Sequence, residues 1–219
     1  MERSAMHRAI LVVLLCAAGC WSLVGCRSAI VTAYTLFNGT DDKADFAGLQ
    51  KKKVVVVCRP LMALQYWDAN VAKELGSEVS QLLRQHVKNI QMVDPRKLSK
   101  WLDENNWEDY TDVGKAMNAD MVLGIDLESF NIFQGQTLYQ GKANVSIHVY
   151  DCKAGGKEVF TRTMPPTIYP PNSQIPTSDR QEGQFRREFT SVLAEQIARH
   201  FYPHDRNEDV AQDAEALRY

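Results

Sequence analysis

The chain has 219 residues, of which 45% are hydrophobic and 24% charged, a balance typical of a globular domain that buries a sizeable core. This length suits one domain of ordinary size with extensions. The 25 Lys and Arg residues nearly balance the 27 Asp and Glu residues, giving a formal net charge of −2. That balance excludes the strong electrostatic attraction on which nucleic-acid binding depends, so we expect no nucleic acid among the partners.

An uncharged, apolar run fills residues 9–26, between Arg8 and Arg27. A basic start followed by a short apolar run is the layout of a secretory signal. The 18 residues of this run are also just long enough to cross a bilayer, so an uncleaved anchor helix is an alternative. Residues 27–50 follow without a helical or strand period, and we interpret them as a tether.

One α/β domain is predicted over residues 51–203. The run "VVVV" at 54–57 predicts a strand buried on both faces, and the apolar period from Trp67 to Val87 predicts a helix. "NIQMV" at 89–93 reads as a short strand. Asp94 and Pro95 then open a helix, because Asp caps helices and Pro suits the first helical position. A further short helix is expected from Thr111 or Asp112.

The second half changes to a period of two. "MVLGIDL" at 121–127, the alternating stretch 138–151 and "EVFTRT" at 158–163 predict an antiparallel meander. The five prolines in residues 164–176 predict an irregular loop over 165–177. Ser178 and Gln181 match a capping box for a final helix over 178–202, and a polar tail follows at 204–219. The fold class is therefore α/β: a mixed sheet with helices on one face, the other face being covered only in part.

The sequence Leu23-Val24-Gly25-Cys26 resembles the bacterial lipobox, in which the Cys receives a diacylglycerol thioether and becomes the first residue of the mature protein. Ala17-Ala18-Gly19-Cys20 is a second match, so Cys26 is the expected lipid attachment site and Cys20 the alternative. In lipoproteins an Asp after this Cys retains the product in the inner membrane. Arg27 stands there instead, or Trp21 for the alternative site, which favours the outer membrane and a domain that faces the periplasm.

The order of elements resembles the small α/β domain shared by the TolB amino-terminal domain, the LpoB-type lipoprotein activators of peptidoglycan synthases and the curli-secretion protein CsgG. The counterparts are "NVAKELGSEVSQLL", "MVDPRKL", "NADMVLGIDL" and "VSIHVYDCKAGGKEVF", within residues 53–164. The proline loop and the final helix depart from that pattern. The resemblance implies an anticodon-binding-domain-like fold and a non-enzymatic binding module of the bacterial cell envelope.

Few residue patterns point to catalysis. Asp126 and Glu128 share one strand face, and His148 lies on the polar face of the meander; paired carboxylates and an imidazole are the groups of acid–base chemistry. Alternation with Ile125 and Leu127 instead makes this a solvated strand face, so we expect no catalytic residue. We also expect no metal ion and no cofactor.

Other candidate residues concern bonding and binding. Cys58 and Cys152 are the cysteines left outside the apolar run, and they form either one disulfide or two separate buried thiols. Tyr139, His148 and Tyr150 are the candidate partner-binding face, because aromatic residues often anchor interfaces.

The first functional hypothesis is a membrane-anchored accessory protein that binds another envelope protein, such as a regulator of peptidoglycan synthesis or of secretion machinery. A self-associating structural subunit of the envelope, and hence a homo-oligomer, is the second. An envelope hydrolase that uses Asp126, Glu128 or His148 is the third.

Overall fold

The computed structural model describes residues 41–60 and 69–205. Residues 43–204 form one compact unit, while Asp41, Asp42 and Asp205 belong to a second. The elements at these ends are the short strands β1 (Asp41–Asp42) and β9 (His204–Asp205). The apolar run with Cys20 and Cys26, and the polar tail from residue 206, lie outside the described residues. Within 41–60 and 69–205, no helix is both long and apolar enough to span a bilayer.

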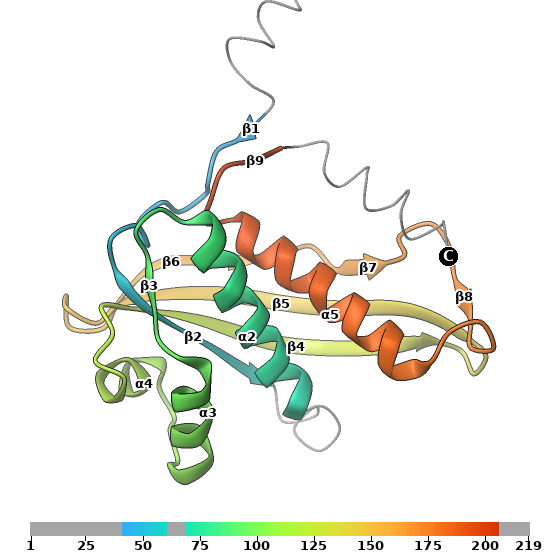
Figure 1. The fold of residues 1–219 in the computed structure, drawn as a ribbon, viewed down its shortest axis with the longest axis horizontal. Coiled ribbons are helices and arrows are strands. Elements are labelled where there is room, and N and C mark those ends of the chain that lie inside the picture. Colours follow the sequence, from blue (N-terminus) through green and yellow to red (C-terminus); the bar gives the residue numbers. More distant parts are fainter. Residues whose placement is uncertain (1–40, 61–68, 206–219) are drawn as a thin grey trace, which may run out of the picture. The chain divides into compact units, whose positions relative to one another are not determined.

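The unit is built on a mixed sheet of seven strands (Figure 1). The main path runs β3-β2-β4-β5-β6, with β7 and β8 paired to β5. The strands are β2 (Lys53–Pro60), β3 (Gln91–Met92), β4 (Met121–Gln134), β5 (Leu138–Asp151), β6 (Lys157–Thr163), β7 (Thr167–Tyr169) and β8 (Ile175–Pro176). β2 pairs in parallel with β3 and β4, whereas all pairs of β5 are antiparallel. The predicted mixed sheet and meander are confirmed.

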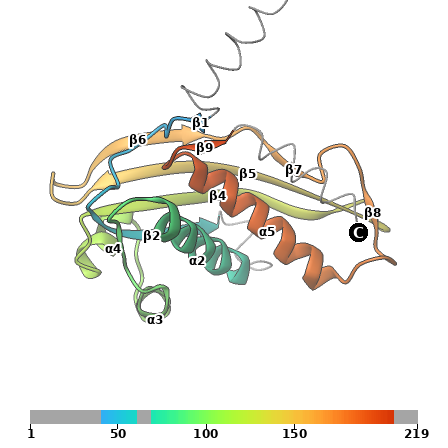
Figure 2. The ribbon, with the colours of Figure 1, turned by 45° about the horizontal axis from the view of Figure 1, so that its top comes forward.

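Two long helices, α2 (Ala69–His86) and α5 (Glu182–Arg199), cover one face of the sheet (Figure 2). Their apolar stripes meet alternate residues of the strands, so that Val54 and Val56 of β2 share a cluster with Leu75 of α2 and Phe189 of α5. The final helix predicted from the apolar period is therefore confirmed. Burial of its stripe against the sheet is the main force that holds it, since helices in proteins depend mostly on such packing.

The short helices α3 (Pro95–Glu104) and α4 (Tyr110–Ala116) pack on the opposite face. The other residues of β2, Val55 and Val57, join a second apolar cluster there with Leu98 and Val113. Asp94 caps α3 as predicted, because its carboxylate accepts a hydrogen bond from the backbone N–H two residues later. These two helices cover only part of this face, as the sequence predicted.

The domain begins before residue 51, which corrects the expected tether boundary. Leu49 is fully buried, and the ring of Phe46 lies 5.4 Å from that of Phe160 and 6.4 Å from that of Phe201. The backbone N–H of Phe46 also donates to the carbonyl of His200. These apolar side chains add to the core, so residues 43–50 pack as part of the domain.

The prolines do not prevent pairing. β7 and β8 both lie inside the expected irregular loop and pair with β5. Proline is tolerated there because edge strands have one side free of ladder hydrogen bonds. Thr167 also donates to the side-chain oxygen of Gln196 on α5, at 2.7 Å.

The capping box is a wrong prediction. The final helix begins at Glu182, and Gln181 precedes it without a side-chain cap bond. Ser178 instead donates to the carboxylate of Asp179. The N-cap position falls on Gln181, three residues after Ser178, so the serine hydroxyl is not placed to accept from the first backbone N–H groups of the helix.

Gly141 tests the packing of α5 on the sheet. A Cβ at this position would lie 2.5 Å from the ring of Phe189, so Gly141→Ala should lower the free energy of unfolding by about 1–3 kcal/mol through overpacking. Gly183→Ala is the matched control, because its Cβ would meet nothing closer than Arg187 at 3.6 Å. Denaturant unfolding measures both, and equal stability of the two variants would contradict the packing described.

Candidate functional site

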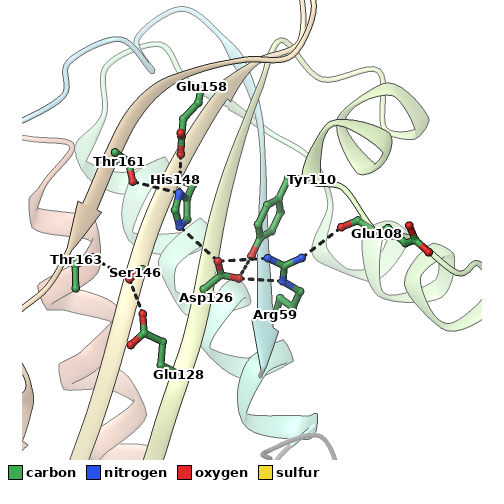
Figure 3. A network of polar contacts seen from close by, with 10 residues as sticks. All are labelled: Arg59, Glu108, Tyr110, Asp126, Glu128, Ser146, His148, Glu158, Thr161 and Thr163. Atoms are coloured by element: carbon green, nitrogen blue, oxygen red, sulfur yellow. Dashed lines mark hydrogen bonds and ion pairs between the residues drawn. The ribbon is translucent and has the colours of Figure 1, made fainter. Parts of the chain in front are cut away.

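A cluster of polar side chains lies on the partly covered face of the sheet, beside α4 (Figure 3). We call it the Asp126 cluster. Its members come from β2, α4, β4, β5 and β6, and they are Arg59, Tyr110, Asp126, Glu128, Ser146, His148, Glu158, Thr161 and Thr163. The three residues considered for catalysis, Asp126, Glu128 and His148, are thus brought to one region.

The carboxylate of Asp126 and the guanidinium of Arg59 form the central ion pair. Parallel pairing of β2 with β4 places the two residues directly opposite each other. Arg59 Nε donates to Oδ1 at 3.0 Å and Nη2 donates to Oδ2 at 3.4 Å, while the Asp126 side chain is only 17% exposed. Hydrogen bonding to Asp126 raises the pKa of Arg59 above its ordinary value. A two-point contact of this kind fixes the orientation of both groups.

Tyr110 completes the environment of Asp126 from α4. Its hydroxyl donates to Oδ1 at 2.7 Å, and burial raises the pKa of this phenol well above its usual range. Asp109 sets the start of α4 by accepting from the backbone N–H of Thr111. Gly124 gives the ring room, because a Cβ there would come within 2.8 Å of it. The expected helix start at Thr111 or Asp112 is late by one or two residues, because α4 begins at Tyr110.

His148 lies between two carboxylates. Nε2 is 3.4 Å from Oδ2 of Asp126, and Nδ1 is 2.6 Å from Oε1 of Glu158 on β6. The hydroxyl of Thr161 lies 3.2 Å from the same Nδ1. The imidazole thus connects the side chains of β4, β5 and β6.

Ser146 and Glu128 form a separate contact. The Ser146 hydroxyl donates to Glu128 Oε1 at 2.6 Å and lies 3.2 Å from the hydroxyl of Thr163. Nucleophilic catalysis needs a hydroxyl within hydrogen-bond reach of a base. Here the serine binds the carboxylate of Glu128, whereas the imidazole faces the carboxylates of Asp126 and Glu158, so the structure contains no hydrogen bond between Ser146 and His148.

Aromatic rings border the cluster on the α4 side. The Arg59 guanidinium lies 4.8 Å from the ring centroid of Tyr110 and 5.9 Å from that of Trp107. Tyr150 stacks on Tyr110 with centroids 5.7 Å apart. Trp107, Tyr150 and Arg59 all remain partly exposed. Arg and large aromatic residues in this state are the side chains that most often anchor protein–protein contacts.

The candidate partner-binding face needs one correction. His148 and Tyr150 lie on the partly covered face, but Tyr139 is buried among the residues of the α2 and α5 side, where its ring lies 4.9 Å from that of Phe185. Tyr139 shares the odd-numbered positions of β5 with Ala143 and Val145. Alternation along the strand therefore turns it into the core.

Of the two alternatives for Cys58 and Cys152, the structure shows separate thiols and no disulfide. Cys58 and Cys152 are both free. Cys58 packs against the cluster formed with α2 and α5, whereas Cys152 packs against the cluster formed with α3 and α4, on the opposite face of the sheet. Burial raises the pKa of each thiol.

Within residues 41–60 and 69–205, no three His, Cys, Asp or Glu side chains are arranged to hold a metal ion. One cavity of about 50 Å³ lies between β2, α2 and α3, and another of about 180 Å³ lies between α2 and α5. Neither is lined by a residue of the Asp126 cluster.

No protein-family model and no curated protein matches the sequence. Among solved structures, the PelC dodecamer from Paraburkholderia phytofirmans is similar with a TM-score of 0.44 and 15% identity, over 74% of this chain and 94% of that one. Lipoprotein GNA1162 from Neisseria meningitidis gives a TM-score of 0.39 and 12% identity, over 67% and 95%. A minor lipoprotein from Acinetobacter baumannii gives 0.38 and 14%, over 70% and 92%. Likenesses of this size carry no conclusion about function.

Tyr110→Phe tests the contribution of the hydroxyl to the Asp126 cluster. The variant keeps the ring but leaves the largely buried carboxylate of Asp126 with one donor fewer, so we expect the free energy of unfolding to fall by about 1–3 kcal/mol. Tyr150→Phe is the matched control and should change stability by less than about 0.5 kcal/mol. Chemical denaturation distinguishes them. A Tyr110→Phe variant as stable as the parent would contradict the role given to this hydrogen bond.

Proposed function

We propose that this protein is a lipid-anchored accessory module of the bacterial cell envelope, which binds another envelope protein and catalyses no reaction. A regulator of peptidoglycan synthesis or of secretion machinery is the specific role that the sequence resemblance suggests. The observation that carries the proposal is the lipobox-like sequence ending in Cys26, ahead of a domain whose polar groups are bonded to one another.

The amino-terminal sequence supports the membrane anchor. A thioether-linked diacylglycerol together with an amino-terminal acyl chain would bind a bilayer stably, which one chain alone would not. Arg27 after Cys26, in place of Asp, favours the outer membrane with the domain facing the periplasm. Cys20 remains the alternative attachment site. In the other alternative, an uncleaved helix over residues 9–26 would cross the membrane and hold the domain without a lipid.

The Asp126 cluster supports a binding role over a hydrolase. A general base must come within hydrogen-bond reach of the proton that it takes from its substrate. The carboxylate of Asp126 already accepts from Arg59 and Tyr110, and both nitrogens of His148 face carboxylates. Groups engaged in this way stabilise the sheet face and hold it rigid.

The partner is proposed to contact the border formed by Trp107, Arg59 and Tyr150. Arg59 is held by Asp126 and by the carbonyl of Glu108 at 3.3 Å, so little side-chain entropy would be lost on binding. The partly exposed rings beside it supply apolar area. A rigid Arg between aromatic rings is the arrangement of an interface anchor.

The lipid anchor is tested by Cys26→Ser. Labelling of cells with an alkyne fatty acid should tag the parent and Cys20→Ser, while Cys26→Ser should lose the label and leave the membrane fraction. Equal labelling of the parent and Cys26→Ser would contradict attachment at Cys26. A label lost only in Cys20→Ser would transfer the attachment to the alternative site.

The binding border is tested by Trp107→Ala and Tyr150→Ala. Each should lower recovery of the partner in a crosslinked pulldown at least tenfold. Truncating an anchor residue costs about 2 kcal/mol or more of binding free energy. Trp101→Ala is the matched control: Trp101 packs on the same apolar cluster but lies on α3. It should lower stability without lowering recovery. Equal recovery from all variants would contradict this surface.

A further inference from the structure

His148 has a carboxylate oxygen at each of its two ring nitrogens (Figure 3). An ionised carboxylate only accepts hydrogen bonds, so both contacts are satisfied only when each nitrogen carries a hydrogen. A neutral imidazole has one N–H, and its other nitrogen would then present a lone pair to a negative oxygen. The geometry therefore depends on the charge of the ring.

Of the two carboxylates that face His148, Glu158 is the one we expect to lose its contact when the ring loses a proton, because it is the more exposed and has fewer other partners among the residues of the Asp126 cluster. Asp126 on β4 already binds the Arg59 guanidinium of β2 and the Tyr110 hydroxyl of α4, whereas Glu158 on β6 is 41% exposed and has the shorter contact with the ring, at 2.6 Å. Tyr150, on the same strand as His148, lies with its ring centroid 6.3 Å away.

The Thr161 hydroxyl of β6 supplies a second partner for Nδ1, at 3.2 Å. A hydroxyl both donates and accepts, so it can donate to Nδ1 when that nitrogen carries no hydrogen. Glu158 cannot do this. The two side chains of β6 at Nδ1 thus suit two different protonation states.

We propose that His148 is a pH-sensitive latch for the edge strand β6. In the doubly protonated ring, Nδ1–H donates to Glu158 and Nε2–H donates to Asp126. When Nδ1 gives its proton to solvent, the Thr161 hydroxyl donates to that nitrogen and the Glu158 carboxylate is released. Because β6 ends the main path of the sheet and pairs there with β5, the loss of this side-chain tie should loosen it more than the inner strands. The latch stands independently of the proposed function.

The test is hydrogen–deuterium exchange of the full chain in detergent between pH 5 and 8.5, with rates corrected for the intrinsic pH dependence of amide exchange. Histidine-selective NMR labels report the charge of His148, assigned with His148→Gln. We expect protection of the amides of β6 to fall about fivefold as His148 loses its proton, while that of β2 stays constant. Protection of β6 that does not follow the charge of His148 would overturn the latch.

Glu158→Gln tests most directly whether the pH dependence of β6 protection requires the Glu158 carboxylate. The amide accepts from Nδ1–H or donates to bare Nδ1, so it pairs with either form of the ring and should abolish the pH dependence of β6 protection. Glu128→Gln is the matched control, since the same change occurs on the same face at a residue bonded to Ser146. It should keep the parent's pH dependence. A Glu158→Gln variant that behaves like the parent would also overturn the proposal.

Discussion

The carboxylate of Asp126 on β4 contacts side chains from three other elements, which are β2, α4 and β5. It accepts from Arg59 on β2 and Tyr110 on α4, and it faces His148 on β5. With a side chain only 17% exposed, it would be unfavourable without such partners, because desolvating a charge is compensated only by donors held in place. Three features position those donors: the parallel register of β2 and β4, the close approach of Tyr110 over Gly124, and the cap that Asp109 provides for α4.

The two faces of the sheet differ in what they leave available to a partner. α2 and α5 cover one face with a continuous apolar cluster, whereas α3 and α4 cover part of the other and stop at the Asp126 cluster. Polar side chains continue from there along β5 and β6. We propose that this partly exposed face, bordered by Trp107, Arg59 and Tyr150, recognises another protein. The same polar ties give β6 a response to pH.

Patterns local in the sequence predicted the fold class. The run of valines predicted that β2 is buried on both faces, and the apolar period predicted α2 and α5. Asp94 with Pro95 predicted the start of α3. The arrangement of the Asp126 cluster could not be predicted in the same way, because it depends on how strands far apart in the sequence pair with one another. Nothing near Arg59 in the chain indicates that parallel pairing sets it opposite Asp126, 67 residues later. The prediction that Tyr139 lies on the polar face is wrong, although its alternation with Ala143 and Val145 along β5 indicates the core. The core positions of Phe46 and Leu49 follow no hydrophobic period.

The most direct measurement is in-cell crosslinking of the unaltered protein, followed by pulldown in detergent and mass spectrometry of everything recovered. If the domain is an accessory module, one other envelope protein should be recovered in stoichiometric amount. Recovery of this chain alone would contradict that account and favour a self-associating structural subunit.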